Sequence, residues 1–269
     1  MLKQKGFETN KIITISFAHL VHDVFSSFLA PLLPLLTQKF GISYSLAGFL
    51  TVAQRFPSLL NPVVGIVAEK LPVRYFLILA PSVTAVSMSL LGAAPSYAYL
   101  IILLFIAGIG ASLFHVPAPV MIKRVAGNRL GKGMSFFMLG GEGARSLGPI
   151  IILGAVHLWG LEKTYYLIPL GLFCSLILYY RFKDIPISDA FKKKNKEIGI
   201  KKTFFKFLPL LLSITGIIFF SSLVKSSLTI YLPIFITSIK GESLWIGGIS
   251  LSILQLAGAG GTFFSGTIS

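Results

Sequence analysis

The segment GGEGARSLGP, residues 140–149, lies within an apolar stretch that we expect to form a helix over residues 132–158. It places the carboxylate of Glu142 three residues before the guanidinium of Arg145, so the two charges share one face of that helix. A charge at the centre of a bilayer costs about 2.5–3.5 kcal/mol on insertion scales. The segment therefore predicts that these groups are paired or face water inside a membrane-embedded bundle.

The composition of the whole chain is typical of a membrane protein. Of its 269 residues 54% are hydrophobic and 12% are charged, and the mean hydropathy is +0.83, whereas a soluble domain carries about 25% charged residues. Most apolar runs are too long for spanning strands and do not alternate in polarity, which favours helices. We expect an all-α membrane protein with eight transmembrane helices, at residues 11–36, 45–68, 75–95, 98–122, 132–158, 164–181, 207–236 and 244–268.

The basic residues lie mostly between these runs and on one side of the membrane. The chain has 24 Lys and Arg against 9 Asp and Glu, a formal net charge of +15. With a cytoplasmic N-terminus, 18 of the 24 fall in cytoplasmic segments and 3 (Lys39, Lys163 and Lys240) in outside loops. This positive-inside distribution predicts a multi-pass protein of the plasma (inner) membrane. The same distribution accounts for most of the net charge of the chain. We therefore expect the lipid bilayer to be a partner of this protein, and we expect no nucleic acid.

A basic loop divides the chain. Residues 183–206 separate a six-helix bundle, residues 1–182, from two further helices, residues 207–269. A weak repeat relates the two parts at offsets of 199 to 201 residues: Pro34, Gln54 and Gly65 correspond to Pro233, Gln255 and Gly266. Internal repeats of this kind are common in transporters. We expect from it that the sequence is a fragment, ending after two helices of an incomplete second half.

A layer of ionisable residues crosses the apolar helices at one depth. Asp23, Arg55, Glu142 and Arg145 lie at similar distances from the cytoplasmic ends of their helices, within a slab of about 5 Å. Such residues usually mark a substrate or proton path, although a layer that only holds helices together remains the alternative. We expect Asp23, paired with one of the two arginines, to be the proton-coupling carboxylate, and Glu142 to be a second one.

Three histidines and a lysine extend this layer. His19 and His22 share a helix face with Asp23, His115 lies in the fourth apolar run, and Lys225 lies in the seventh. Histidine titrates near neutral pH and can relay protons. A single histidine that bonds a neighbouring helix is the simpler alternative. Lys225 is expected to attract an anionic group or to pair across the two parts of the chain.

Other classes of function are also compatible with parts of this pattern. His19, His22 and Asp23 on one face could hold zinc, but we expect no metal or cofactor, because no further ligand cluster is evident. Glu142 with scattered histidines is vaguely similar to glutamate-type intramembrane proteases, yet Gly141 occupies the place of their second glutamate. A third alternative is an inactive or regulatory membrane protein.

The loop after the second helix, GIVAEKLPVR, resembles the cytoplasmic motif G-x-x-x-[DE]-[RK]-x-x-x-[RK] of the major facilitator superfamily of secondary transporters. Gly65, Glu69, Lys70 and Arg74 occupy the motif positions. The resemblance implies a proton-coupled secondary transporter, not an enzyme, that works by alternating access on a small-molecule substrate, as a monomer. It also implies that this loop gates one access state, that helices 1, 4 and 7 line a central cavity, and that helices 3 and 6 stand outside it.

Three further segments resemble the fosmidomycin-resistance-protein branch of this superfamily: HLVHD at 19–23, SLFHVPAP at 112–119, and the segment that ends in Gly148 and Pro149. The Gly-Pro pair is similar to a motif at which antiporter helices bend. The resemblance implies export of a small molecule. Arg55, Glu142 and Arg145 replace uncharged residues expected in this branch, so the substrate is not carried over.

Overall fold

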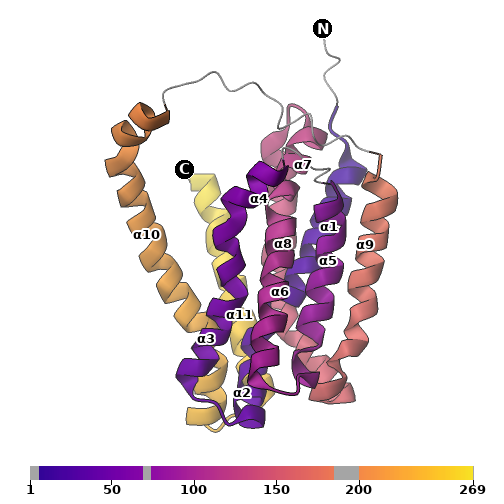
Figure 1. Ribbon diagram of the computed structural model, residues 1–269, viewed down its shortest axis with the longest axis vertical. Coiled ribbons are helices and arrows are strands. Elements are labelled where there is room, and N and C mark those ends of the chain that lie inside the picture. Colours follow the sequence, from indigo (N-terminus) through magenta and orange to yellow (C-terminus); the bar gives the residue numbers. More distant parts are fainter. Residues whose placement is uncertain (1–5, 69–73, 185–199, 269) are drawn as a thin grey trace.

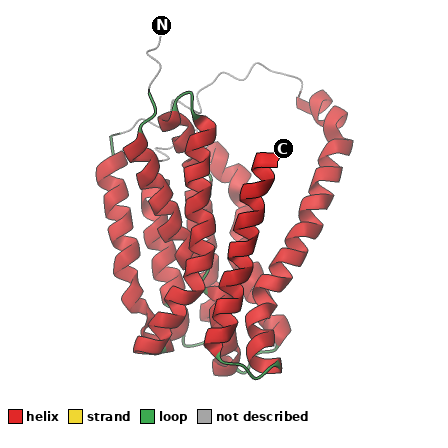
Figure 2. Ribbon diagram, turned by 180° about the vertical axis from the view of Figure 1, so that it is seen from behind, coloured by secondary structure: helices red, strands yellow, loops and turns green. Residues whose placement is uncertain are grey.

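The computed structural model describes residues 6–68, 74–184 and 200–268, and within these ranges every regular element is a helix or a helical turn (Figure 2). The helices run side by side as one bundle (Figure 1). In chain order they are α1 (Thr9–Ser26), α2 (Leu29–Phe40), α3 (Tyr44–Arg55), the 3₁₀ turn η1 (Phe56–Leu60), α4 (Asn61–Ala68), α5 (Arg74–Ser89), η2 (Leu91–Ala93), α6 (Tyr97–His115), α7 (Pro117–Ala126), α8 (Leu130–Trp159), η3 (Leu161–Leu167), α9 (Ile168–Phe182), α10 (Ile200–Ile234), the π-helical turn η5 (Phe235–Ile239) and α11 (Leu244–Ile268).

Seven helical segments of the described chain are long and apolar enough to cross a membrane. They are Thr9–Phe40, Arg74–Ala93, Tyr97–Ala126, Leu130–Trp159, Leu161–Phe182, Phe204–Ile239 and Leu244–Gly261. Each corresponds to one of the eight predicted helices, and the predicted all-α membrane fold is confirmed. The remaining prediction, 45–68, folds as α3, η1 and α4 in series along the bundle (Figure 1) and is not among the seven.

Several predicted single helices are broken near the middle of the bundle. The first divides into α1 and α2, and the hydroxyl of Ser27 donates to the carbonyl of Val24 (2.7 Å) at the junction. The fourth divides into α6 and α7 before Pro117, which has no N–H for the helix ladder. By contrast, α8 runs without interruption from Leu130 to Trp159, so the Gly148–Pro149 pair lies inside a continuous helix.

Small residues allow α1 and α8 to pack closely. A Cβ at Gly140 would overlap the backbone oxygen of Ser16, and one at Gly141 would overlap the ring of His19. Gly148 lies against the α1–α2 junction in the same way, where a Cβ would overlap the hydroxyl of Ser27. Such close approach is the usual basis of helix association in lipid, where the hydrophobic effect does not drive helices together.

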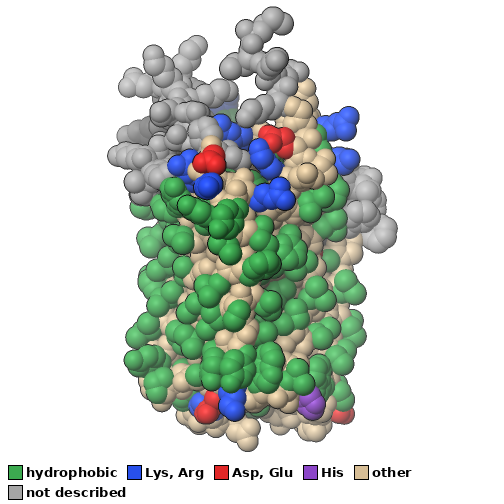
Figure 3. Space-filling model, turned by 90° about the vertical axis from the view of Figure 1, so that its right-hand side faces the viewer, with side chains coloured by type: hydrophobic (Ala, Val, Ile, Leu, Met, Phe, Trp, Pro, Cys, Tyr) green, Lys and Arg blue, Asp and Glu red, His purple; other side chains and the backbone are tan. Residues whose placement is uncertain are grey.

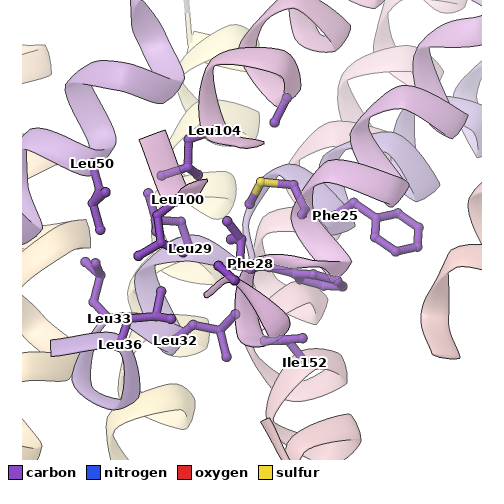
Figure 4. Packing of buried hydrophobic residues seen from close by; sticks show 14 of the residues in the cluster. Phe25, Phe28, Leu29, Leu32, Leu33, Leu36, Leu50, Leu100, Leu104 and Ile152 are labelled. Atoms are coloured by element: carbon purple, nitrogen blue, oxygen red, sulfur yellow. The ribbon is translucent and has the colours of Figure 1, made fainter. Parts of the chain in front are cut away.

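An apolar core fills the space between α2, α3, α6 and α8. Figure 4 shows side chains of this cluster pointing toward one another, including Phe28, Leu33, Leu100 and Ile152. The outside of the bundle is also apolar: Figure 3 shows a belt of hydrophobic side chains, with Lys and Arg gathered at the end where the N-terminus lies. This arrangement is the one expected of a helical bundle surrounded by lipid.

The two parts of the chain meet at the end of the bundle opposite the N-terminus. The phenol of Tyr231 in α10 donates to the carbonyl of Tyr44 (3.4 Å), and α11 lies on α8, where a Cβ at Gly248 would overlap Leu153. The N-terminal end of α10 leans away from the other helices in both views (Figures 1 and 2). The packing between the two parts is therefore closer at one end of the bundle than at the other.

We predict that Gly140→Ala destabilises the protein by about 1–3 kcal/mol, because the added methyl group forces α1 away from α8. The measurement is the unfolding temperature of the purified protein in detergent. Gly143→Ala is the matched control, since a Cβ added there would meet no atom within 4 Å, and it is expected to be neutral or slightly stabilising. Equal unfolding temperatures for the two variants would contradict the proposed helix contact.

Candidate functional site

A cavity of about 490 Å³ lies between the helices. Residues of α1, α2, α3, η1 and α4, which together form the first two predicted helices, line one part of it. Residues of α6, α8, α10 and α11 line the rest. Within the described chain, α5 and α9 contribute no lining residue. This is the arrangement that the resemblance implied, with the third and sixth membrane segments standing outside the cavity.

Three of the five charged or histidine residues on the described cavity wall lie close to helix breaks. Asp23 is three residues before the end of α1, Arg55 is the last residue of α3, and His115 is the last residue of α6. Arg145 of α8 and Lys225 of α10 complete the set of charged and histidine side chains on the wall. Broken helices supply unpaired backbone groups and space for water, and this is where polar side chains can exist at membrane depth.

Asp23 lies between two histidines. Its Oδ2 is 3.3 Å from Nε2 of His19, one turn earlier on α1, and its Oδ1 is 3.3 Å from Nε2 of His115 on α6. Asp23 and His115 both line the cavity, and His115 is the more exposed of the two, with 40% of its side chain exposed against 7% for Asp23. His19 Nε2 and Asp23 Oδ1 make no hydrogen bond within the described chain, so these contacts are electrostatic.

The tautomer of His19 follows from its other contact. Nδ1 of His19 lies 2.7 Å from the carbonyl oxygen of Phe137 on α8. A carbonyl only accepts hydrogen bonds, so Nδ1 carries a proton and donates it. A neutral His19 therefore presents a lone pair on Nε2 to the carboxylate of Asp23, and this contact is repulsive. It becomes attractive when one more proton resides on His19 Nε2 or on Asp23.

Aromatic rings hold the histidines in place. His19 stacks on Phe137 with ring centroids 3.9 Å apart, and His22 stacks on Phe114 at 4.5 Å. His22 is fully buried, and neither of its ring nitrogens has a hydrogen-bond partner within the described residues. Phe114 and Phe137 could not be assigned to the site from sequence, because nothing distinguishes them from the many other phenylalanines of the chain.

Glu142 and Arg145 form an ion pair on α8. Nη1 of Arg145 lies 2.6 Å from Oε1 of Glu142, and the two side chains are 35% and 15% exposed, respectively. Arg145 lines the cavity, and Glu142 lies three residues earlier on the same helix face. The two charges of the segment 140–149 are thus paired with each other, and Arg145 also lies beside a cavity, as expected for charges at membrane depth.

Arg55 and Lys225 line the same cavity without an acidic partner. No ion pair joins either side chain to a carboxylate among the residues that the structure describes. Arg145 is close enough to Arg55 for their like charges to repel. The prediction that Asp23 pairs with an arginine is wrong, because the contacts of its carboxylate are with histidines and Arg145 is paired with Glu142.

Two glutamines on the cavity wall have equivalent contacts. Gln54 of α3 donates from Nε2 to the carbonyl of Ser26 at the end of α1 (2.9 Å), and Gln255 of α11 donates from Nε2 to the hydroxyl of Thr229 in α10 (3.2 Å). Each glutamine thus joins its membrane segment to the preceding one. The weak sequence repeat pairs these two positions, and it was the signal that could have assigned them to the site.

The other predicted groups are distributed as follows. Glu69 and Lys70 of the loop motif lie outside the described residues, whereas Gly65 lies in α4 and Arg74 begins α5. The zinc alternative would now involve His115 in place of His22, since ligand atoms of His19, Asp23 and His115 lie within 4.8 Å of one another. The cationic side chains on the wall oppose a divalent cation there.

Comparison with known proteins assigns the family. Residues 15–269 match the sequence model described as Major Facilitator Superfamily, and the chain belongs to this family. Two curated relatives are the fosmidomycin resistance protein of Escherichia coli (strain K12), 28% identical over 165 residues, and the uncharacterized MFS-type transporter YfnC of Bacillus subtilis (strain 168), 23% identical over 141 residues. The matches cover 61% and 52% of this chain but 41% and 34% of those proteins.

Solved structures support the same fold. A bacterial homologue of the human lysosomal transporter Spinster, described as inward-facing and unoccupied, superposes with a TM-score of 0.76 at 17% identity, over 98% of this chain and 62% of that one. Tetrameric PepTSo2 gives a TM-score of 0.54, also at 17% identity, over 83% and 49%. Proteins of this family are transporters and not enzymes, so the protease alternative is excluded.

Proposed function

We propose that the protein is a proton-coupled secondary transporter that moves a small molecule across the membrane by alternating access. The observation that carries the proposal is the position of Asp23 between His19 and His115 on the cavity wall, with Nδ1 of His19 committed to Phe137. Because the contact between His19 and Asp23 becomes attractive when a proton is added, this cluster could take a proton from the cavity and return it. No metal is needed for this chemistry.

Protonation of this cluster would change the charge of the cavity wall. His19 and His22 lie beside Asp23 on α1, His115 faces it from α6, and the wall also carries Arg55, Arg145 and Lys225 from α3, α8 and α10. On loss of the proton, the negative charge of Asp23 is no longer balanced within the cluster. Because His19 lies on α1 and His115 lies on α6, a change in their attraction to Asp23 would bias the protein toward one access state.

The packing of the bundle supports alternating access as the mechanism. Tyr231 contacts α3 and α11 packs on α8 at one end, while α10 leans away from the other helices at the end where the N-terminus lies. In the family's mechanism one part of the bundle rocks against the other around a site near the midplane. The arrangement is the one expected for a cavity that opens toward the N-terminal side.

The remaining parts of the proposal concern placement and direction. The Lys and Arg at the end of the bundle nearer the N-terminus support a cytoplasmic N-terminus and a location in the plasma (inner) membrane. The name of the Escherichia coli relative connects that protein with drug resistance, which favours export of a small molecule here. We propose that the protein acts as a monomer.

We predict that Asp23→Asn abolishes proton movement while substrate exchange remains. The assay uses proteoliposomes loaded with a pH-sensitive dye and compounds that acidify or alkalinise the lumen of wild-type vesicles. With the variant, the same compounds are expected to produce a change in luminal pH that is at least about tenfold smaller. Exchange of labelled for unlabelled compound needs no net proton transfer and should continue. Asp184→Asn, at an exposed carboxylate just after α9, is the matched control. Unchanged proton movement in Asp23→Asn would exclude this carboxylate as the coupling site.

We also predict the orientation of the chain. Cysteines introduced for Lys123 and Lys163, which are exposed at opposite ends of the bundle, should react with an impermeant maleimide from opposite sides of the membrane. In intact cells Lys163→Cys should react and Lys123→Cys should react only after permeabilisation. Cys174 is buried, which keeps the background low. Reaction of Lys123→Cys in intact cells would reverse the proposed topology.

A further inference from the structure

The charges on the cavity wall do not balance. Arg145 has Glu142 at 2.6 Å and the pair is neutral. Asp23 is then the one carboxylate on the described wall, while Arg55 and Lys225 contribute two positive charges without an acidic partner. The wall therefore has an excess of positive charge, and this excess grows when the His19–Asp23 pair holds its proton.

Such cations are costly in a membrane protein unless they are paired or reach water, and Arg55 and Lys225 reach the cavity without a paired carboxylate in the described chain. Arg55 and Arg145 lie near each other on α3 and α8, where their like charges repel. Lys225 faces the same cavity from α10. An anion in the cavity would remove the repulsion and provide the missing partner, and a guanidinium binds carboxylate or phosphate oxygens through two parallel hydrogen bonds.

Hydroxyl groups supply further donors beside these cations. Ser222, Ser226 and Thr229 lie on one face of α10 around Lys225, and all three line the cavity. The hydroxyl of Thr229 already donates to the backbone oxygen of Lys225 (2.8 Å), so Ser222 and Ser226 are the hydroxyl groups that can donate to a ligand. A volume of about 490 Å³ is within the range of small-molecule sites.

We propose that this cavity binds a small, water-soluble organic anion that carries an oxyanion group (phosphate, phosphonate or carboxylate), with Arg55 and Lys225 as its principal charge partners. The inference rests on the proposed transport function for the role of this anion as substrate, but the binding site itself follows from the charges on the wall. Because Arg55 and Lys225 belong to the two different parts of the chain, an anion held by both joins those parts around the cavity.

The test is the unfolding temperature of the purified protein in an uncharged detergent at constant ionic strength. Inorganic phosphate and succinate are expected to raise it, since a ligand that binds the folded state stabilises it by mass action, whereas tetraethylammonium is not. The concentration of anion that gives half of the effect should increase at least about tenfold in Arg55→Gln and in Lys225→Gln. Lys163→Gln, at an exposed site outside the cavity, should behave as wild type.

Because removal of a cavity cation could itself alter stability, equilibrium binding of radiolabelled phosphate is measured on the same variants. The proposal is overturned if no anion binds, if the two cavity variants bind as wild type does, or if stabilisation requires an anionic lipid such as phosphatidylglycerol. Such a failure of anion binding would leave the proposed coupling role of Asp23 standing, provided that Asp23→Asn still fails to move protons. Conversely, anion binding with no effect of Asp23→Asn would remove the coupling mechanism and keep the site.

Discussion

The exclusion of unpaired charge from the hydrocarbon core of the membrane is the constraint on which this structure depends. Each ionisable group of the polar layer in the described chain meets it in one of two ways. Glu142 and Arg145 neutralise each other at 2.6 Å, and Asp23 lies between two histidines with which it can share a proton. Arg55 and Lys225 reach the cavity instead. The cavity is therefore a consequence of where the charges are, as well as the place where a substrate can bind.

The helix breaks and the glycines serve this arrangement. The break between α6 and α7 follows His115 directly, and the 3₁₀ turn η1 follows Arg55, so both side chains are presented where the helices are least regular. Where α1 meets α8, Gly140 and Gly141 bring the two helices close enough for the carbonyl of Phe137 to bind Nδ1 of His19. The contact between α1 and α8 thus fixes the tautomer of His19 on which the proposed role of Asp23 depends.

Sequence alone predicted the helices and the identity of the polar layer, because hydropathy and the cost of buried charge are local properties. It could not predict the partners. Asp23 was expected beside an arginine, but its neighbours are His19, one turn away on the same helix, and His115, which tertiary packing brings from α6. The internal repeat, although weak, correctly paired Gln54 with Gln255: both line the cavity, and each donates a hydrogen bond to the membrane segment before its own. Pro149 was a less reliable signal, because proline usually breaks a helix and here it lies inside the continuous helix α8.

Infrared difference spectroscopy of the purified protein between high and low pH measures the central claim most directly, because it detects the protonation of individual carboxyl and imidazole groups. If Asp23 and His19 share an exchangeable proton, the wild-type spectrum contains carboxyl or imidazolium bands that are missing from Asp23→Asn, and these bands shift in deuterium oxide because the cavity admits water. Identical difference spectra for the two proteins would contradict the account.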